Sequence, residues 1–291
     1  MNKRTFLKTS SALLASTMLS PLISCRDEQK PLTNWAENLT YSTGNVRYPK
    51  TVAEVQEVLR QANKIRALGS RHSFNTIADS TVQQLSLKDM EKVTTLDKTA
   101  NTITVEGSRR YGEFCEYLHQ AGYALHNLAS LPHISVAGAC ATATHGSGIK
   151  NGNLATAVAA IEFVHGGGEL VTLSRAQNPD IFDGAVVGLG ALGVVTKVTL
   201  NVQPTFMMQQ AVYRNLPVSA LATNFETIMG SGYSVSLFTD WQNERVNQVW
   251  IKSKIEGNST TPVKLAPEFY GAKPATQNMH PLDDHSAENC T

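Results

Sequence analysis

Two stretches of this 291-residue chain combine residue types that suit the binding of a phosphate-bearing ligand. The first is Ala67-Leu68-Gly69-Ser70-Arg71-His72-Ser73-Phe74, where a short apolar run ends in small and polar residues. Small residues leave backbone N–H groups free in a turn, and such a turn can wrap these donors around a diphosphate. Arg71 adds a positive charge to the same turn.

The second stretch runs from Asn127 to Gly148, and almost every residue from Ser135 to Gly148 is small. This composition makes a poor core, but it lets the backbone approach a flat ligand closely. Its Ser and Thr hydroxyls can both donate and accept hydrogen bonds. A small-residue packing interface is the alternative interpretation of this stretch.

Two other glycine motifs fit known functional patterns less well. Residues 188–193 match the GxGxxG dinucleotide fingerprint, but a strand is predicted after it instead of a helix, and no acidic residue follows at the expected distance. His165-Gly166-Gly167-Gly168 is similar to an esterase oxyanion loop, yet the chain has no GxSxG nucleophile. The histidines form no metal-binding pattern, so we expect no metal site.

The composition is that of an ordinary globular protein. Lys and Arg total 25 against 24 Asp and Glu, a net charge of +1, which offers no basic surface for nucleic acid. The four cysteines lack CxxC or zinc-site spacing, so neither a disulfide scaffold nor a structural metal is expected.

The first residues predict an export signal. Lys3, Arg4 and Lys8 precede an apolar run from about Ala12 to Ile23, which is too short for a comfortable membrane span. Leu22-Ile23-Ser24-Cys25 resembles a bacterial lipobox, so we expect residues 1–24 to be removed and Cys25 to be lipidated. The protein would then be exported and lipid-anchored, facing the periplasm or the cell exterior. A plain secretory signal with an incidental Cys25 is the alternative.

The remaining pattern predicts an α+β protein. A helix should begin after Thr51, which forms a capping box with Glu54, and further helices are expected over 111–121 and 180–187. Strands are expected around the following ranges: 65–68, 85–87, 103–105, 158–164, 170–173 and 194–202. From about Pro204 the pattern changes to antiparallel strands over 207–213, 235–238 and 246–252. Helices and strands mix without strict βαβ alternation, which favours α+β.

Three motifs in this order resemble one family. GSRHSFNTIADS, LHNLASLPHISVAGACATATHGSG and GALGVVTKVTL are similar to the vanillyl-alcohol-oxidase (PCMH) type of FAD-binding flavoprotein, and within it to alditol oxidases and sugar-1,4-lactone oxidases. The resemblance implies an FAD domain of two α/β subdomains over residues 46–204, after a tether and entry segment at 25–45. An incomplete antiparallel-sheet substrate or cap domain would follow over 205–291, because full-length members are considerably longer.

The resemblance also implies roles for individual residues. His72 lies where family members attach the flavin covalently through its 8α-methyl carbon, and a neutral imidazole is a suitable nucleophile. Hydrogen bonding of His72 to the flavin without a covalent bond is the alternative. The cofactor-binding positions implied are Ala67, Leu68, Gly69, Ser70, Arg71, His72, Ser73, Ser130, Ser135, Gly138, Thr142, Thr144, His145 and Val195.

The implied reaction oxidises a C–OH group of a polyol or sugar lactone, with hydride transfer to flavin N5 and dioxygen as the acceptor that gives hydrogen peroxide. No catalytic acid, base or substrate residue is assigned, because the family's later substrate-contacting strand and its terminal His-Trp-x-Lys element are absent from this chain. A flavin-binding exported lipoprotein without turnover is the alternative function.

Overall fold

The computed structural model describes residues 31–255, 266–277 and 279. The predicted export signal over 1–24 and the predicted lipidation site Cys25 therefore lie outside the described residues. Within the described ranges, no helix is both long enough and apolar enough to cross a bilayer.

A small parallel sheet forms the first part of the described chain. Its strands are β1 (Val46–Arg47), β2 (Arg66–Ala67) and β3 (Gln84–Leu85), in the order β1-β3-β2. Helix α2 (Val52–Gln61) begins where the capping box predicts, since the Thr51 hydroxyl accepts from the Glu54 N–H at 3.2 Å. The short 3-10 helix η1 (Thr76–Ala78) lies between β2 and β3.

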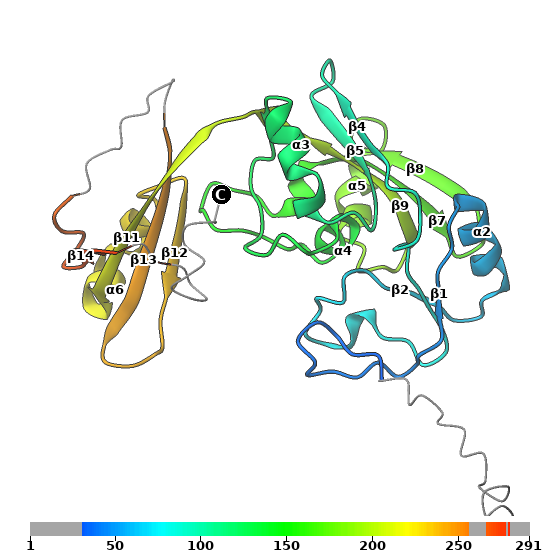
Figure 1. The fold of residues 1–291 in the computed structure, drawn as a ribbon, viewed down its shortest axis with the longest axis horizontal. Helices are drawn as coiled ribbons and strands as arrows, with labels where there is room; N and C mark the ends of the chain where they lie inside the picture. The colour runs from blue at the N-terminus through cyan, green and yellow to red at the C-terminus, as the bar shows by residue number, and fades with distance from the viewer. Residues whose placement is uncertain (1–30, 256–265, 278, 280–291) are drawn as a thin grey trace, which may run out of the picture. The chain divides into compact units, whose positions relative to one another are not determined.

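A five-stranded antiparallel sheet follows, in the order β4-β5-β9-β7-β8 (Figure 1). Its strands are β4 (Thr94–Asp97), β5 (Thr102–Glu106), β7 (Val158–His165), β8 (Leu170–Ser174) and β9 (Gly193–Asn201). The strands predicted in this region are confirmed. Strand β4, whose residues alternate between half-buried and exposed, was not predicted. Gly168 has a φ of +83° in the β7–β8 hairpin, so the triple glycine serves a turn.

Three short helices pack against this sheet and share its largest apolar cluster. They are α3 (Cys115–Gln120), α4 (Val136–Ala141) and α5 (Pro179–Val186). The 3-10 helices η2 (Tyr111–Glu113) and η3 (Leu154–Ala157) complete the layer, so the single helix predicted over 111–121 is divided at Phe114.

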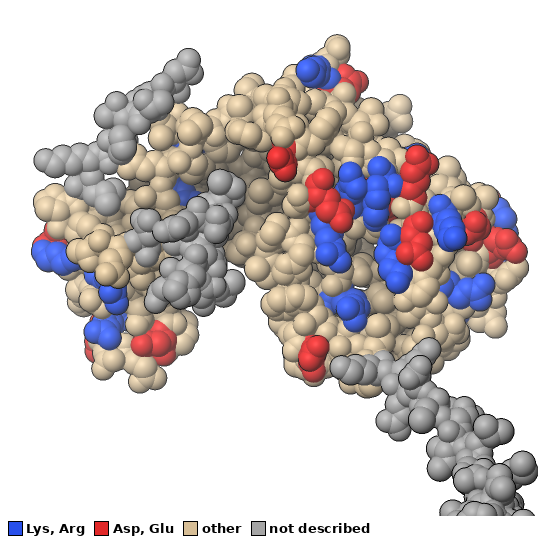
Figure 2. Space-filling model, in the orientation of Figure 1, with Lys and Arg blue, Asp and Glu red and all other residues tan. Residues whose placement is uncertain are grey.

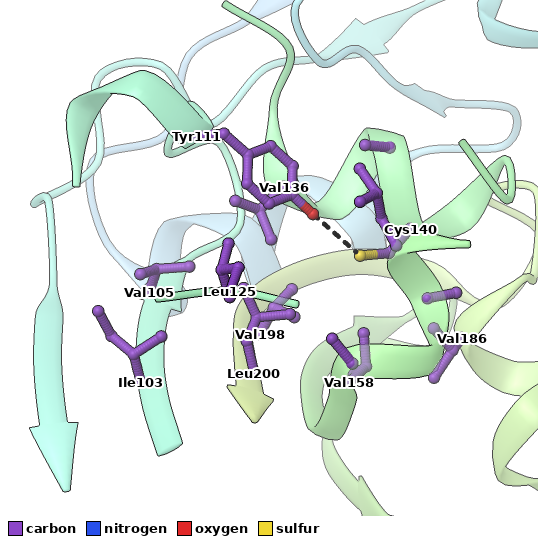
Figure 3. Close-up of a cluster of buried hydrophobic side chains, with 14 of the residues drawn as sticks. Ile103, Val105, Tyr111, Leu125, Val136, Cys140, Val158, Val186, Val198 and Leu200 are labelled. Atoms are coloured by element: carbon purple, nitrogen blue, oxygen red, sulfur yellow. Dashed lines mark hydrogen bonds between the residues drawn. The ribbon is translucent and has the colours of Figure 1, made fainter. Parts of the chain in front are cut away.

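Figure 3 shows this apolar cluster, in which the side chains of Tyr111 and Cys140 point toward each other. The Tyr111 hydroxyl and the Cys140 sulfur are 3.6 Å apart. Burial raises the pKa of the Cys140 thiol to about 11, so this thiol stays protonated and packs as an apolar group.

A second apolar cluster joins the two sheets. Val55 and Leu59 from α2 pack with Leu85 and Leu87 and with Val164 and Val194 from β7 and β9. The parallel sheet is thereby held against the start of β9.

Two further antiparallel sheets contain strands from residue 203 onward. Strand β6 (Tyr123–Ala124) pairs with β10 (Gln203–Pro204). The predicted antiparallel sheet beyond Pro204 is confirmed, with the order β12-β13-β11-β14. Its strands are β11 (Met207–Pro217), β12 (Ser234–Phe238), β13 (Arg245–Ile255) and β14 (Lys273–Pro274). Helix α6 (Val218–Met229), which was not predicted, contributes the buried Ile228 to the sheet's own apolar cluster.

The charged side chains on the face shown in Figure 2 are of both signs and intermixed. This distribution agrees with the net charge of +1, and the described residues on this face form no broad basic surface of the kind that nucleic acid attracts.

The central cluster generates a stability prediction. Phe114 is fully buried between η2 and α3, so Phe114→Ala should lower the free energy of unfolding by about 3–5 kcal/mol through lost transfer energy and a cavity. Tyr117→Ala, three residues further on in α3 and 46% exposed, is the matched control and should cost much less. Urea denaturation measures both, and equal losses would contradict the assignment of Phe114 to the core.

Candidate functional site

A cavity of about 530 Å³ lies where the sequence predicts a cofactor site. This volume is within the range of small-molecule and cofactor sites. The turn after β2, the stretch around α4 and the first residues of β9 all line it. The predicted cofactor residues that line it are Ala67, Leu68, Gly69, Ser70, Arg71, His72, Ser73, Ser130, Ser135, Gly138, Thr142, Thr144 and Val195.

His145 is the predicted residue that the structure places outside the cavity lining. Its side chain is exposed, and its Nδ1 lies 3.0 Å from the carbonyl oxygen of Gly146. The structure therefore gives His145 a local contact within its own loop and no place on the wall.

The turn after β2 presents backbone donors without protein acceptors. The N–H groups of Arg71, His72 and Ser73 donate to no residue in the described part of the chain. Arg71 has a φ of +63°, the left-handed conformation that allows successive N–H groups to point to one side. Because buried or ligand-facing N–H groups need a partner, this turn fits a bound diphosphate.

The turn is held by an upstream segment. The Trp35 N–H donates to the Arg71 carbonyl at 2.8 Å, and the Arg71 guanidinium donates to the Thr33 carbonyl at 2.9 Å. The Asn34 side chain donates to the Ser73 carbonyl at 3.0 Å. The Arg71 side chain therefore has a structural partner in addition to its place on the cavity wall.

Ser70 and Ser135 join the turn to the start of α4. The Ser135 N–H donates to the Ser70 hydroxyl at 3.1 Å, and the Ser70 N–H donates to the Ser135 hydroxyl at 3.4 Å. A Cβ on Gly69 would lie 2.6 Å from the Ser135 hydroxyl oxygen, so a side chain there would break the junction. The small residues at these positions allow the two backbones to meet.

Helix α4 divides the small-residue stretch between the core and the cavity. Val136, Ala139 and Cys140 are buried in the apolar cluster, while Gly138 and Thr142 are exposed and line the cavity. The Thr142 hydroxyl donates to the Gly138 carbonyl at 3.0 Å. One face of the stretch therefore packs in the core, and the other face lines the cavity.

Gly107 and Ser108 line the cavity, and the sequence analysis did not identify them. The Gly107 N–H donates to the Thr196 carbonyl at 2.9 Å, and the Gly107 carbonyl accepts from Ala137 at 3.1 Å. Ser108 is fixed by Glu106, a 1% exposed carboxylate that accepts from the Ser108 N–H at 2.7 Å and pairs with Lys92 at 3.2 Å. The only signal in the sequence is an acidic residue at the end of an apolar strand.

The GxGxxG motif contributes to the cavity in a different way from a dinucleotide fingerprint. Leu189 and Gly190 line the cavity in left-handed conformations, with φ of +50° and +72°. Strand β9 begins at Gly193, so the expected absence of a helix after the motif is confirmed. The motif is a tight turn that leads the chain into the cavity wall.

His72 lines the cavity and has one imidazole nitrogen without a described partner. Its Nε2 is buried and has no hydrogen-bond partner among the described residues. Because buried polar groups are normally satisfied, this atom fits a bond to a bound cofactor. His133 also has a buried Nε2 without a described partner, and burial, together with the charges of His72 and Arg110, lowers its pKa.

The other described histidines make local contacts. His126 lies with its Nε2 3.3 Å from the Gly152 carbonyl oxygen, a structural contact. Over the described ranges, no three His, Cys, Asp or Glu side chains come together in a group that could hold a metal ion.

Part of the chain that lines the cavity is similar to a family of FAD-binding domains. Residues 44–174 match the family model of the FAD binding domain, and this range includes both the turn after β2 and helix α4. The free N–H groups of the turn and the unpaired His72 nitrogen agree with this similarity, because an FAD would satisfy both.

The chain is also similar to several oxidoreductases that act on polyols or sugar lactones, as their names state. The chain is 44% identical over 263 residues to an alditol oxidase of a Streptomyces species, covering 89% of this chain and 61% of that protein. It is 34% identical to the mouse L-gulonolactone oxidase, covering 62% of this chain and 42% of that protein. It is 31% identical to the L-gulono-1,4-lactone dehydrogenase of Mycobacterium tuberculosis, covering 69% of this chain and 47% of that protein. The chain thus spans less than two thirds of the length of these relatives.

Gly107 allows a test of the cavity wall. A methyl group on Gly107 would lie 2.2 Å from the Val195 carbonyl oxygen, so the backbone on one side must move. Gly107→Ala should lower the free energy of unfolding by about 1–3 kcal/mol, as overpacking does, and should weaken FAD binding by roughly tenfold.

Gly184→Ala in α5 is the matched control, because nothing lies within 4 Å of its added methyl group. This variant should be neutral or slightly stabilising. Urea denaturation and fluorescence titration with FAD measure the two effects. If Gly107→Ala keeps the wild-type FAD affinity and free energy of unfolding, the close packing assigned to Gly107 at the cavity wall is wrong.

Proposed function

We propose that the protein oxidises a C–OH group of a polyol or of a sugar lactone with FAD bound in the cavity. The observation that carries the proposal is the combination of the free N–H groups of residues 71–73 with the unpaired His72 nitrogen on one cavity wall. The names of the relatives, an alditol oxidase and two proteins acting on L-gulonolactone, supply the substrate class.

Bound FAD would supply the two-electron acceptor for the hydride that leaves the substrate carbon. The N–H groups of Arg71, His72 and Ser73 would donate to its diphosphate. Gly138, Thr142 and Thr144 would allow close approach along its length, because their side chains are absent or short. Leu189, Val194 and Val195 form an apolar part of the wall that would exclude water.

Dioxygen is the proposed electron acceptor, with hydrogen peroxide as the product. Two of the relatives above are named oxidases and one is named a dehydrogenase. The acceptor is therefore the property on which members of this group differ, and the test must include both dioxygen and an artificial acceptor.

His72 is the proposed point of covalent attachment to the flavin. It lines the cavity, and its Nε2 has no described partner, so a bond at a ring nitrogen would break no protein hydrogen bond at that atom. Covalent linkage raises the redox potential of a flavin in the resembling family, which would help it accept a hydride from an unactivated alcohol.

A turnover assay tests the proposed reaction. The protein with bound FAD should release peroxide on addition of xylitol, sorbitol or L-gulono-1,4-lactone, with one peroxide for each substrate oxidised. If an artificial acceptor is reduced and no peroxide forms, dioxygen is not the acceptor and the protein is a dehydrogenase. Bound flavin that stays oxidised with every substrate would favour the flavin-binding protein without turnover.

The attachment has its own test. Wild-type protein precipitated with acid should keep its yellow colour and its mass increase of one FAD, whereas His72→Ala should lose both and still bind FAD reversibly. His119→Ala is the matched control, because His119 is an exposed histidine of α3 outside the cavity. A colourless wild-type precipitate with intact His72 would contradict covalent attachment.

A further inference from the structure

Two aromatic rings, of Trp35 and His133, stack on the imidazole of His72, and the ring of Phe74 meets it edge-on at 5.4 Å. Trp35 and His72 have ring centroids 4.6 Å apart with planes 14° apart. His72 and His133 are separated by 5.0 Å and 29°, and Trp35 and His133 by 5.2 Å and 25°. Trp35 and His133 lie outside the residues that line the cavity.

These distances exclude a simple column of rings. In a column of three parallel rings the outer two would be about twice as far apart as neighbours, whereas all three centroid separations are similar here. The rings therefore form a triangle, in which each ring contacts both others. Rotation of the His72 ring is restricted from two sides, because turning it would break contacts with Trp35 and with His133.

Each ring comes from a different segment, and hydrogen bonds fix the segments to one another. The Trp35 N–H donates to the carbonyl of Arg71, the residue directly before His72. The Ser70 and Ser135 pair fixes the turn of His72 to the residues that follow His133. The triangle is thus held by backbone anchors on both sides of His72.

The surroundings of His133 favour its neutral form. Burial is the largest cause that lowers the pKa of His133, and the positive charge of Arg110 lowers it further. A neutral His133 adds no positive charge beside the imidazole of His72, which must itself be neutral to act as a nucleophile. Trp35 is half exposed, so it covers the ring pair from the solvent side.

We propose that Trp35 and His133 are positioning residues that hold the His72 imidazole at the cavity wall in the orientation needed for its covalent bond to the flavin. This inference rests on the proposed attachment at His72. It adds that the speed of attachment depends on two side chains that do not line the cavity.

The bond joins a ring nitrogen of His72 to the 8α-methyl carbon of the flavin. The methyl group and the imidazole N–H each lose one proton as the C–N bond forms, and these two protons with the two electrons released reduce the flavin ring. Dioxygen then accepts both and leaves as hydrogen peroxide, so the attached flavin returns to its oxidised form. Trp35 and His133 take no part in this exchange of atoms and act only on the position of the nucleophile.

The experiment follows attachment over time in full-length protein made in a flavin-deficient host. FAD is added, and the flavin that survives acid precipitation is measured at intervals. Trp35→Leu and His133→Ala should attach FAD roughly ten- to a hundredfold more slowly, which is the cost of misplacing a reacting group by about an ångström. Trp35→Phe keeps an aromatic ring and should restore most of the rate.

Reversible affinity is measured separately in the His72→Ala background, where attachment cannot occur. Adding Trp35→Leu or His133→Ala to that background should leave the FAD dissociation constant within about threefold, a change below the ~1.4 kcal/mol of a tenfold effect. Trp241→Leu and His119→Ala serve as controls, because Trp241 is 89% exposed and His119 is exposed on α3. Both controls should attach FAD at the wild-type rate.

The outcomes distinguish this inference from the one on which it rests. If wild type attaches FAD through His72 while Trp35→Leu and His133→Ala attach it equally fast, the positioning role alone is overturned. If both variants instead lose reversible affinity in the His72→Ala background, their role is structural and the inference is again overturned. If wild type binds FAD but never attaches it, the proposed attachment fails and this inference fails with it.

Discussion

The reciprocal hydrogen bonds between Ser70 and Ser135 are the constraint on which the cavity depends. The two residues are 65 positions apart, and each donates its backbone N–H to the hydroxyl of the other. A Cβ at either Gly69 or Gly138 would come within 2.8 Å of the Ser135 hydroxyl oxygen. One buried hydroxyl therefore determines the residue type at two further positions and the spacing of both loops. All four residues of this junction, Gly69, Ser70, Ser135 and Gly138, line the cavity.

The sheet transmits the same constraint to the opposite wall. Gly107 is hydrogen-bonded to Ala137 of α4 on one side and to Thr196 of β9 on the other, so its carbonyl and N–H connect the helix to the sheet. The buried carboxylate of Glu106 then fixes Ser108 beside it. A charge at this depth is costly unless it is paired, and here Lys92 and Ser108 supply the partners. These polar contacts hold Gly107 and Ser108 in place on the cavity wall.

The sequence predicted the parts of the fold and site that have local signals. The Thr51–Glu54 cap, the alternating strands from Val158 to Leu173 and the turn from Gly69 to Ser73 all carry residue types whose conformational preferences decide the outcome. Helix α4 was not predicted because Gly138 and the β-branched Val136 have low helix propensity, and burial of Val136, Ala139 and Cys140 overrides it. Gly107 and Trp35 were missed because their roles arise from contacts with residues far along the chain, for which a single sequence has no local pattern.

The position of β9 in the sheet has a consequence for the order of folding. This strand lies between β5 and β7, yet it is the last of the five along the chain, and its pairing with β5 brings together residues such as Thr104 and Thr199 that are 95 positions apart. Before β9 is in place, the hairpins β4-β5 and β7-β8 each have an unpaired inner edge, which is exposed to aggregation while the long loop closes. The cavity wall formed by Val194 and Val195 arrives with the same strand. A chain in which β9 has not yet paired therefore has an incomplete cavity wall.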